Sequence, residues 1–143
     1  MLGSLLICVV IIALKFLCVT SVALGGTPTI SSGGYTWYSI VLQKGDTRSV
    51  SISTDGNPVD VMVMDSENFS DYKVAAECDC IKNREWTVLQ SGDRITQWAD
   101  TFKAPKHDRY YFVIDNTNVP TGGANAKKPV KVNVNIVKPQ NID

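Results

Sequence analysis

The sequence lacks the residue patterns from which most enzyme sites are built. It contains one histidine, and it has no G-x-S-x-G, Walker loop, G-x-G-x-x-G or H-E-x-x-H motif. A Ser-His-Asp hydrolase would need that histidine, His107, which lies in the charged run K-H-D-R, where a solvated side chain is the simpler interpretation. We therefore predict a protein without catalytic activity.

An excess of one charge is also absent. The chain has 14 basic and 14 acidic residues, and loss of Lys15 with a cleaved leader would leave 13 basic residues against 14 acidic ones (14 minus 1). Nucleic-acid-binding domains and polybasic membrane-binding segments carry a clear basic excess. We expect no nucleic-acid partner, and contact with a membrane only through the N-terminal segment if it is retained.

Cysteine is scarce outside the leader, because only Cys78 and Cys80 lie beyond residue 24. A disulfide across one intervening residue is strained, and it stabilises little because the loop it closes is tiny. Three interpretations stay open: a local disulfide, bridges between chains, and thiols that take part in redox chemistry or a metal site. A zinc site would need two further ligands, and His107 alone cannot complete it.

A long apolar run occurs only at the start of the chain. Residues 2–24 are almost all Leu, Ile, Val, Cys and Ala, with Lys15 as their sole charge. The triplet S-V-A that ends at Ala23 is typical of a signal-peptide cleavage site. We expect removal of this segment and a secreted, extracellular or cell-surface protein. The alternative is an uncleaved signal anchor, since about 20 apolar residues suffice to span a bilayer.

The remainder of the chain alternates apolar and polar residues in short segments separated by turn residues. No window of 11 or more residues has helical periodicity, so we predict an all-β antiparallel β-sandwich of seven or eight strands after an N-terminal hydrophobic targeting helix. Residues 25–34 are expected to form a flexible Gly/Ser/Thr-rich arm, residues 35–138 the sandwich and residues 139–143 a tail. The predicted strands span residues 35–42, 48–53, 59–65, 72–76, 85–89, 95–102, 109–115 and 130–137.

Some of these segments carry more specific predictions. Residues 35–42 and 48–53 flank the turn K-G-D and are expected to form a hairpin, whereas residues 66–73 are polar and predicted to be a loop. The segment 109–115 has large side chains on both faces, with Tyr110, Phe112 and Ile114 on one of them. We therefore expect it to be a central strand with a neighbour on each side.

Three stretches together resemble a known family. Residues 38–46 (Y-S-I-V-L-Q-K-G-D), residues 59–65 (V-D-V-M-V-M-D) and the pair F-K-A-P and Y-Y-F-V-I at 102–105 and 110–114 are similar to motifs of bacterial and archaeal pre-peptidase C-terminal (PPC) domains. The last pair also resembles the GOLD domain of Golgi trafficking proteins. The PPC resemblance implies a jelly-roll-like extracellular β-sandwich that accompanies secreted enzymes and is not itself catalytic.

Exposed aromatic side chains are the first candidates for a binding site. Tryptophan makes rigid contacts with sugars and with protein partners, although core packing is its more frequent role. The chain has Trp37, Trp86 and Trp98, and Trp37 alternates with the apolar face of its strand and should therefore be exposed.

Two other patterns indicate modification or ion binding. Asn68 begins the sequon N-F-S, which predicts N-glycosylation on an exposed loop. Acidic residues recur at strand ends and turns, and loops of β-sandwiches sometimes gather such oxygens around calcium. Ordinary turn roles are the simpler interpretation, and we expect no cofactor apart from that calcium alternative. The four weak calcium ligands are Asp55, Asp60, Asp65 and Asp115.

Three functional hypotheses follow. The first is a non-catalytic secreted or cell-surface module that binds a protein, a glycan or the cell envelope. The second is a structural subunit of an extracellular filament or surface assembly, in which residues 25–34 or an edge strand complete the sheet of a neighbouring copy. The third is a redox- or metal-dependent activity at Cys78 and Cys80.

Overall fold

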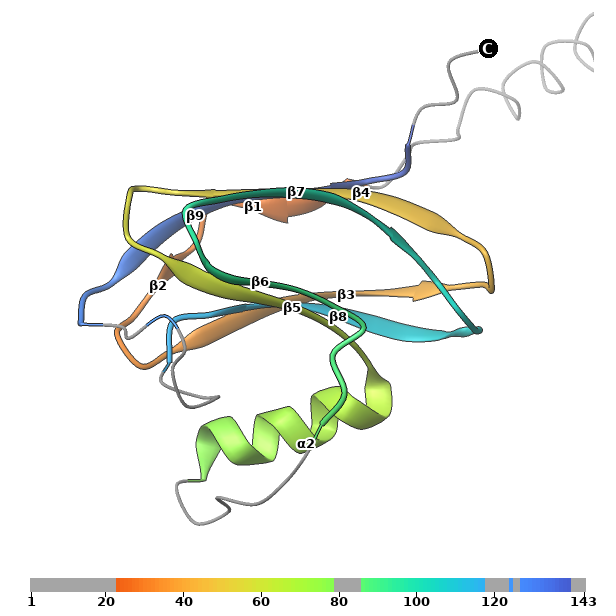
Figure 1. Ribbon diagram of the computed structural model, residues 1–143, viewed down its shortest axis with the longest axis horizontal. Coiled ribbons are helices and arrows are strands. Elements are labelled where there is room, and N and C mark those ends of the chain that lie inside the picture. The colour runs from red at the N-terminus through yellow and green to blue at the C-terminus, as the bar shows by residue number, and fades with distance from the viewer. Residues whose placement is uncertain (1–22, 79–85, 118–123, 125–126, 140–143) are drawn as a thin grey trace, which may run out of the picture.

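Two antiparallel sheets packed face to face form the body of the protein, as predicted. The computed structural model describes residues 23–78, 86–117, 124 and 127–139. Figure 1 shows the sheets as two layers, with one helix beneath the four-stranded sheet. The five-stranded sheet has the order β1 (Leu24–Gly26), β9 (Val130–Val137), β4 (Thr47–Thr54), β7 (Gln97–Lys103), with β2 (Thr29–Ile30) also on β9. The four-stranded sheet has the order β3 (Tyr35–Leu42), β8 (Asp108–Asp115), β5 (Val59–Asp65), β6 (Gln90–Ile95).

The main core lies between the sheets and follows the alternation of the sequence. Every second residue of β9, from Val130 to Ile136, is buried, and the residues between them are exposed. Phe112 of β8 is fully buried from the opposite sheet. The predicted inner faces are therefore confirmed, because a period of two places alternate side chains on opposite faces of a strand. The buried residues of this core are Ile30, Leu42, Val50, Ile52, Val59, Val61, Val63, Phe102, Ala104, Tyr110, Phe112, Ile114, Val130, Val132, Val134 and Ile136.

The strand β8 is central, as its two apolar faces predicted. It pairs with β3 on one side and with β5 on the other. All seven residues of β5 are buried as well, because the helix α2 (Ser66–Glu77) covers the face of the sheet turned away from the main core. Met62, Met64 and Val113 form a second core there with Phe69 and Tyr72 of the helix.

The helix α2 corrects the prediction of a polar loop at 66–73 and a strand at 72–76. Its start is marked by Asp65, whose Oδ1 accepts a hydrogen bond from the backbone N–H of Asn68 at 3.1 Å. Only Phe69 and Tyr72 are buried along its twelve residues. Two buried positions are too few to make the apolar stripe by which an amphipathic helix is recognised, so packing on the sheet stabilises this helix more than its own sequence pattern does.

The predicted hairpin between β3 and β4 is also wrong, because the two strands belong to different sheets. The turn after Leu42 carries the chain across the edge of the sandwich. It is held by the segment after β7: Gly45 N–H donates to the carbonyl of Ala104, and Ala104 N–H donates to the carbonyl of Asp46. Both strands keep their predicted inner faces, and those faces meet across the core.

The chain between α2 and β8 was predicted less well. Glu85 lies outside the described residues, and residues 86–89, expected to continue a strand from it, are irregular. The strand expected at 95–102 is present as β7, shifted by one or two residues, and β6 was missed. The β6 sequence Q-S-G-D-R-I contains a glycine and two charges and only one β-branched residue, so it has little strand propensity.

Residues 25–34 are not the flexible arm that their composition predicted. β1 and β2 pair with β9, which brings the strands of the described residues to nine, and the side chain of Ile30 is buried in the main core. β1 begins at Leu24, the residue that follows the predicted cleavage point. Residues 1–22, which hold most of the predicted leader, and residues 140–143 of the predicted tail lie outside the described part of the chain. No described helix is long and apolar enough to cross a membrane.

Gly25 is the position where β1 depends most closely on glycine. A Cβ atom there would lie 2.1 Å from the carbonyl oxygen of Val134, and the residue has φ = 155°. Because a backbone oxygen cannot move aside, Gly25→Ala is expected to lower the free energy of unfolding by about 1–3 kcal/mol. Urea unfolding would measure the loss. Thr27→Ala, at an exposed position before β2, is the matched control and should change stability by no more than about 0.5 kcal/mol; equal stability of the two variants would contradict the close packing of β1 on β9.

Candidate functional site

The three tryptophans occupy different environments: Trp37 is exposed, and Trp86 and Trp98 are half-buried. Trp37 lies on the outer face of β3 with 43% of its surface accessible, as its alternation predicted. Trp86 packs against Tyr72 of the helix in an edge-to-face contact, with ring centroids 5.7 Å apart. Trp98 packs against the main core from β7. The structure does not bring the three rings together, so they do not form one aromatic binding platform.

Asp55 and Asp65 hold the backbone at turns. Asp55 accepts a hydrogen bond from the backbone N–H of Lys131 at 3.1 Å, and backbone hydrogen bonds of this kind lower its pKa. Asp65 caps the helix and lies 2.9 Å from the ammonium group of Lys106. Burial would raise the pKa of Asp65, but the hydrogen bonds from Lys106 and Asn68 outweigh burial and hold that pKa below its usual value.

Asp60 and Asp115 lie directly opposite each other on β5 and β8. Asp60 accepts hydrogen bonds from the backbone N–H groups of Arg94, at 2.6 Å, and Ala124, at 2.9 Å. Asp115 accepts one from Thr117 N–H through Oδ1, while its Oδ2 and the hydroxyl of Tyr72 are buried without a hydrogen-bond partner among the described residues.

Burial raises the pKa of Asp115 to about 6, and the nearby charge of Asp60 acts in the same direction, while the hydrogen bonds from Thr117 act against them and lower the pKa. The four acidic residues predicted as weak calcium ligands therefore have separate structural roles. Among the described residues, no three or more His, Cys, Asp or Glu side chains gather in an arrangement that could hold a metal ion.

Asn68 does not lie on an exposed loop, which corrects that part of the glycosylation prediction. It is a half-buried residue in the first turn of α2. Its Nδ2 donates to Asp65 Oδ1 at 2.7 Å, and its Oδ1 accepts from the N–H of Thr87 at 2.6 Å. The side-chain amide thus links the helix to the segment before β6, and attachment of a glycan stays a prediction.

Cys78 directly follows α2, and its backbone N–H donates to the carbonyl of Val74. Cys80 lies outside the described residues. The pairing of these two cysteines, and any redox or metal chemistry at them, stays a prediction.

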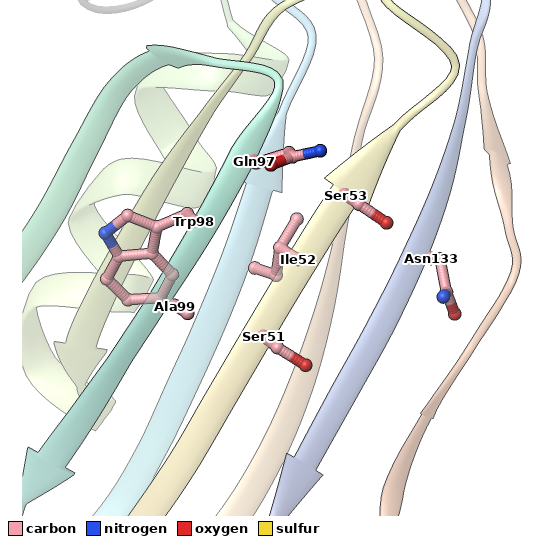
Figure 2. Close-up of a pocket in the computed structure, with 7 residues that line it drawn as sticks. All are labelled: Ser51, Ile52, Ser53, Gln97, Trp98, Ala99 and Asn133. Atoms are coloured by element: carbon pink, nitrogen blue, oxygen red, sulfur yellow. The ribbon is translucent and has the colours of Figure 1, made fainter.

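The outer face of the five-stranded sheet carries an extended hollow that the sequence did not reveal. A central hollow of about 430 Å³ is lined by Ser51, Ile52, Ser53, Gln97, Trp98, Ala99 and Asn133. Two further hollows, of about 370 and 210 Å³, share lining residues with it and continue it along β4. We name the three together the polar trough. Figure 2 shows Ser51, Ser53 and Asn133 projecting to one side of the strands and the ring of Trp98 on the other.

Strand register explains how the trough is built. Ser53 pairs with Gln97 of β7 on one side and with Asn133 of β9 on the other, and Ser51 pairs in the same way with Ala99 and Asn135. Short hydroxyl and carboxamide side chains therefore stand in adjacent rows across three strands, and they leave the surface low and open. None of the described residues that line the central hollow is charged, while Asp100, Asp55 and Lys131 line its two extensions.

The side chains of the central hollow can donate and accept many neutral hydrogen bonds, and none of those described there is titratable. Hydroxyls and carboxamides each supply donors and acceptors. The alternation of β4 predicted that its serines face outward, and this is confirmed for Ser51, which is exposed. Nothing in the sequence indicated that these serines would lie between Gln97 and Asn133, because sheet order is a long-range property.

Comparisons with known proteins find structures of similar fold, but the matching sequences are hardly related to this one. No protein-family model matches the chain, and a search of characterised protein sequences gives no match. Among solved structures, the chain is similar to Aeromonas hydrophila PliG, a periplasmic inhibitor of g-type lysozyme: identity is 12%, 84% of this chain and 89% of that chain are covered, and the TM-score is 0.56. It is also similar to the Yersinia pseudotuberculosis-derived mitogen YPM, with 8% identity, 86% and 91% coverage and a TM-score of 0.50. At these identities the likeness concerns the fold alone.

Proposed function

We propose that this protein is a non-catalytic binding module that acts outside the cytoplasm and holds a neutral glycan in the polar trough. The observation that carries the proposal is the uncharged row of Ser51, Ser53, Gln97 and Asn133 on a sheet face that no described helix or strand covers. The hydrophobic leader at residues 2–24 supports export. The PPC resemblance is part of the proposal, since it implies an extracellular module without catalytic activity.

The chemistry of the trough suits a ligand rich in hydroxyl groups. Sugar hydroxyls exchange hydrogen bonds with hydroxyl and carboxamide side chains, and a neutral ligand brings no charge that would need a partner. The ring of Trp98 points to the other side of the strands and packs against the main core, so the trough would contact a sugar through its polar side chains. An acidic polymer would meet no cation among the described residues of the central hollow.

A protein partner is the second candidate. It is supported by the shared fold with PliG, which inhibits g-type lysozyme. The two candidates differ in a direct measurement, because an inhibitor would lower the rate at which g-type lysozyme clears a suspension of bacterial cell walls. A glycan-binding module would leave the initial lysozyme rate unchanged when the cell-wall substrate is in excess over the module.

The glycan proposal predicts saturable binding of neutral oligosaccharides. Isothermal titration calorimetry with cellohexaose, maltohexaose and chitohexaose should give a binding isotherm for at least one of them, and none for polygalacturonate. Ser51→Glu places a charge in the centre of the trough and should weaken that binding at least tenfold. The matched control is Ser91→Glu, an exposed serine of β6 in the other sheet, which should bind as the wild type does.

Two results would contradict the proposal. One is the absence of binding for all three neutral oligosaccharides, and the other is an equal loss of affinity in Ser51→Glu and Ser91→Glu. Circular dichroism of both variants must match the wild type, so that a loss of binding reports on the trough and not on the fold.

A further inference from the structure

β3 is an edge strand whose outer side has no partner strand among the described residues. It pairs with β8 on one side and ends the order of the four-stranded sheet on the other. Its eight residues, Y-T-W-Y-S-I-V-L, include no charge, no proline and no glycine, and its register with β8 runs without a bulge. Natural proteins usually protect such an edge with charges, proline, bulges or short length, because unpaired backbone groups attract another strand.

The other edges of the two sheets carry that protection. β6 contains Asp93 and Arg94, and its pairing with β5 has a register shift. β7 contains Asp100 and Lys103. β1 is only three residues long and is followed by Pro28. In the described part of the chain, β3 is therefore the one long edge strand without a protecting residue.

The side chains of β3 make it complementary to a second copy of itself. The large apolar residues most exposed on the whole described surface, Trp37 at 43% and Val41 at 48%, both lie on its outer face. Trp37 lies two residues before Ser39, and Val41 lies two residues after it. If two copies of β3 pair antiparallel about Ser39, Trp37 of each copy lies directly opposite Val41 of the other.

This register satisfies the geometry of a continuous sheet. In this register a two-fold axis perpendicular to the sheet lies midway between the two Ser39 residues. It keeps the outer faces of both copies on the same side of the joined sheet and makes every contact reciprocal. Aromatic and β-branched residues directly opposite each other stabilise antiparallel pairs. On the inner face, the same register sets Tyr38, which is half-buried, opposite Ile40 of the second copy, also half-buried. A shift by one residue would place outer-face residues opposite inner-face ones.

We propose that β3 pairs with β3 of a second copy of this chain, so that two four-stranded sheets join into one continuous sheet across a dimer. The proposal is independent of the polar trough, which lies on the other sheet. It also refines the hypothesis of strand exchange: residues 24–30 already pair with β9 of their own chain, so the edge strand β3 provides the contact and the arm does not. Because one strand pair covers less than the ~1,200–2,000 Å² of a standard stable interface, the dimer should be weak and concentration-dependent.

A cysteine placed on the two-fold axis tests the register directly. The experiment uses the chain from Leu24 onward, where β1 and the folded domain begin, with Cys78 and Cys80 replaced by serine so that the introduced cysteine alone can form the crosslink. Directly opposite residues of an antiparallel pair have Cα atoms about 4.5–5.5 Å apart, within the range that a disulfide spans. Ser39→Cys should therefore give a covalent dimer under mild oxidation, detected by non-reducing electrophoresis and reversed by a reductant.

Two controls separate this register from random crosslinking. In this register Val41 of one copy and Val41 of the other are four residues apart along the strand, a distance of about 13 Å. Val41→Cys should therefore crosslink much less than Ser39→Cys. Ser91→Cys, exposed on the protected edge β6, reports collision between monomers. Ser39→Lys sets like charges opposite each other and should abolish the dimer in sedimentation velocity runs while leaving the circular dichroism spectrum unchanged.

The outcomes decide the proposal. Rapid crosslinking of Ser39→Cys alone, together with a wild-type dimer that Ser39→Lys dissociates, supports it. A wild type that sediments as a monomer at all concentrations up to the millimolar range overturns it, and so does equal crosslinking of Ser39→Cys, Val41→Cys and Ser91→Cys. A dimer that persists in Ser39→Lys also overturns it, because it would use another surface.

Discussion

Replacing Phe112 by alanine is expected to lower the free energy of unfolding by about 3–5 kcal/mol, a large share of the stability of a domain of this size. Phe112 is fully buried between the two sheets. Its ring meets that of Phe102 edge to face, with centroids 5.8 Å apart. Removal of the ring leaves a cavity that strands paired on both sides cannot close. Urea unfolding followed by tryptophan fluorescence measures the loss.

Lys131→Ala is the matched control for this experiment. Lys131 lies on the exposed face of β9, between Val130 and Val132, which are buried. Its backbone N–H, which the substitution retains, makes the hydrogen bond to Asp55. The variant should differ from the wild type by no more than about 0.5 kcal/mol. Equal unfolding midpoints for Phe112→Ala and the wild type would refute the core between the sheets.

The second large effect is a dependence of stability on pH that comes from Asp115. This carboxyl group is fully buried beside Tyr72 and Asp60, and burial raises its pKa from 3.8 to about 6. Because the pKa is higher in the folded than in the unfolded chain, ionisation of Asp115 favours unfolding. Its contribution to stability is fully present below pH 3.8 and is lost as the pH rises through about 6. At about 1.4 kcal/mol for each pKa unit, the loss amounts to about 3 kcal/mol.

Asp115→Asn isolates this contribution. Asparagine keeps an oxygen that can accept the hydrogen bond from Thr117 N–H, but it does not ionise. The stability of the variant relative to the wild type should therefore increase by about 2–3 kcal/mol between pH 4 and pH 7.5. Asp55, Asp65 and Asp108 have lowered pKa values, but they are present in both proteins, so their titration cancels in the difference. A stability difference between the two proteins that stays constant with pH would show that ionisation of Asp115 does not destabilise the folded protein.

Parts of the candidate site could be read from the sequence and parts could not. The exposure of Trp37 followed from its alternation with Tyr38 and Ile40 along β3. Trp98 could not be assigned in this way, because its segment Q-W-A-D-T-F has only weak alternation. The acidic residues were considered as calcium ligands because they stand at strand ends and turns. At turns, however, a carboxylate most often accepts hydrogen bonds from nearby backbone N–H groups, as Asp55 does.

The helix shows why local pattern can mislead. Residues 66–77 have two buried positions, Phe69 and Tyr72, three residues apart. On the sequence this spacing is indistinguishable from two isolated aromatics in a loop. In the folded protein, Phe69 stacks on Tyr111 with ring centroids 3.9 Å apart, and Tyr72 contacts Tyr35 edge to face. These partners come from β8 and β3, so the energy that holds the helix in place is long-range.

By itself the sequence determined which residues of β4, β5, β8 and β9 face the core between the sheets, the central place of β8 and the absence of known catalytic motifs, because side-chain alternation and motifs are local properties of the chain. Only the tertiary structure decided that β3 and β4 belong to different sheets, that Ser51 and Ser53 stand between Gln97 and Asn133, and that β3 is left as an unprotected edge. The physical reason is that a strand with one apolar face can satisfy its backbone hydrogen bonds with any strand of matching register. The choice among such strands depends on how all the faces close around a common core, and no single segment of the sequence contains that information.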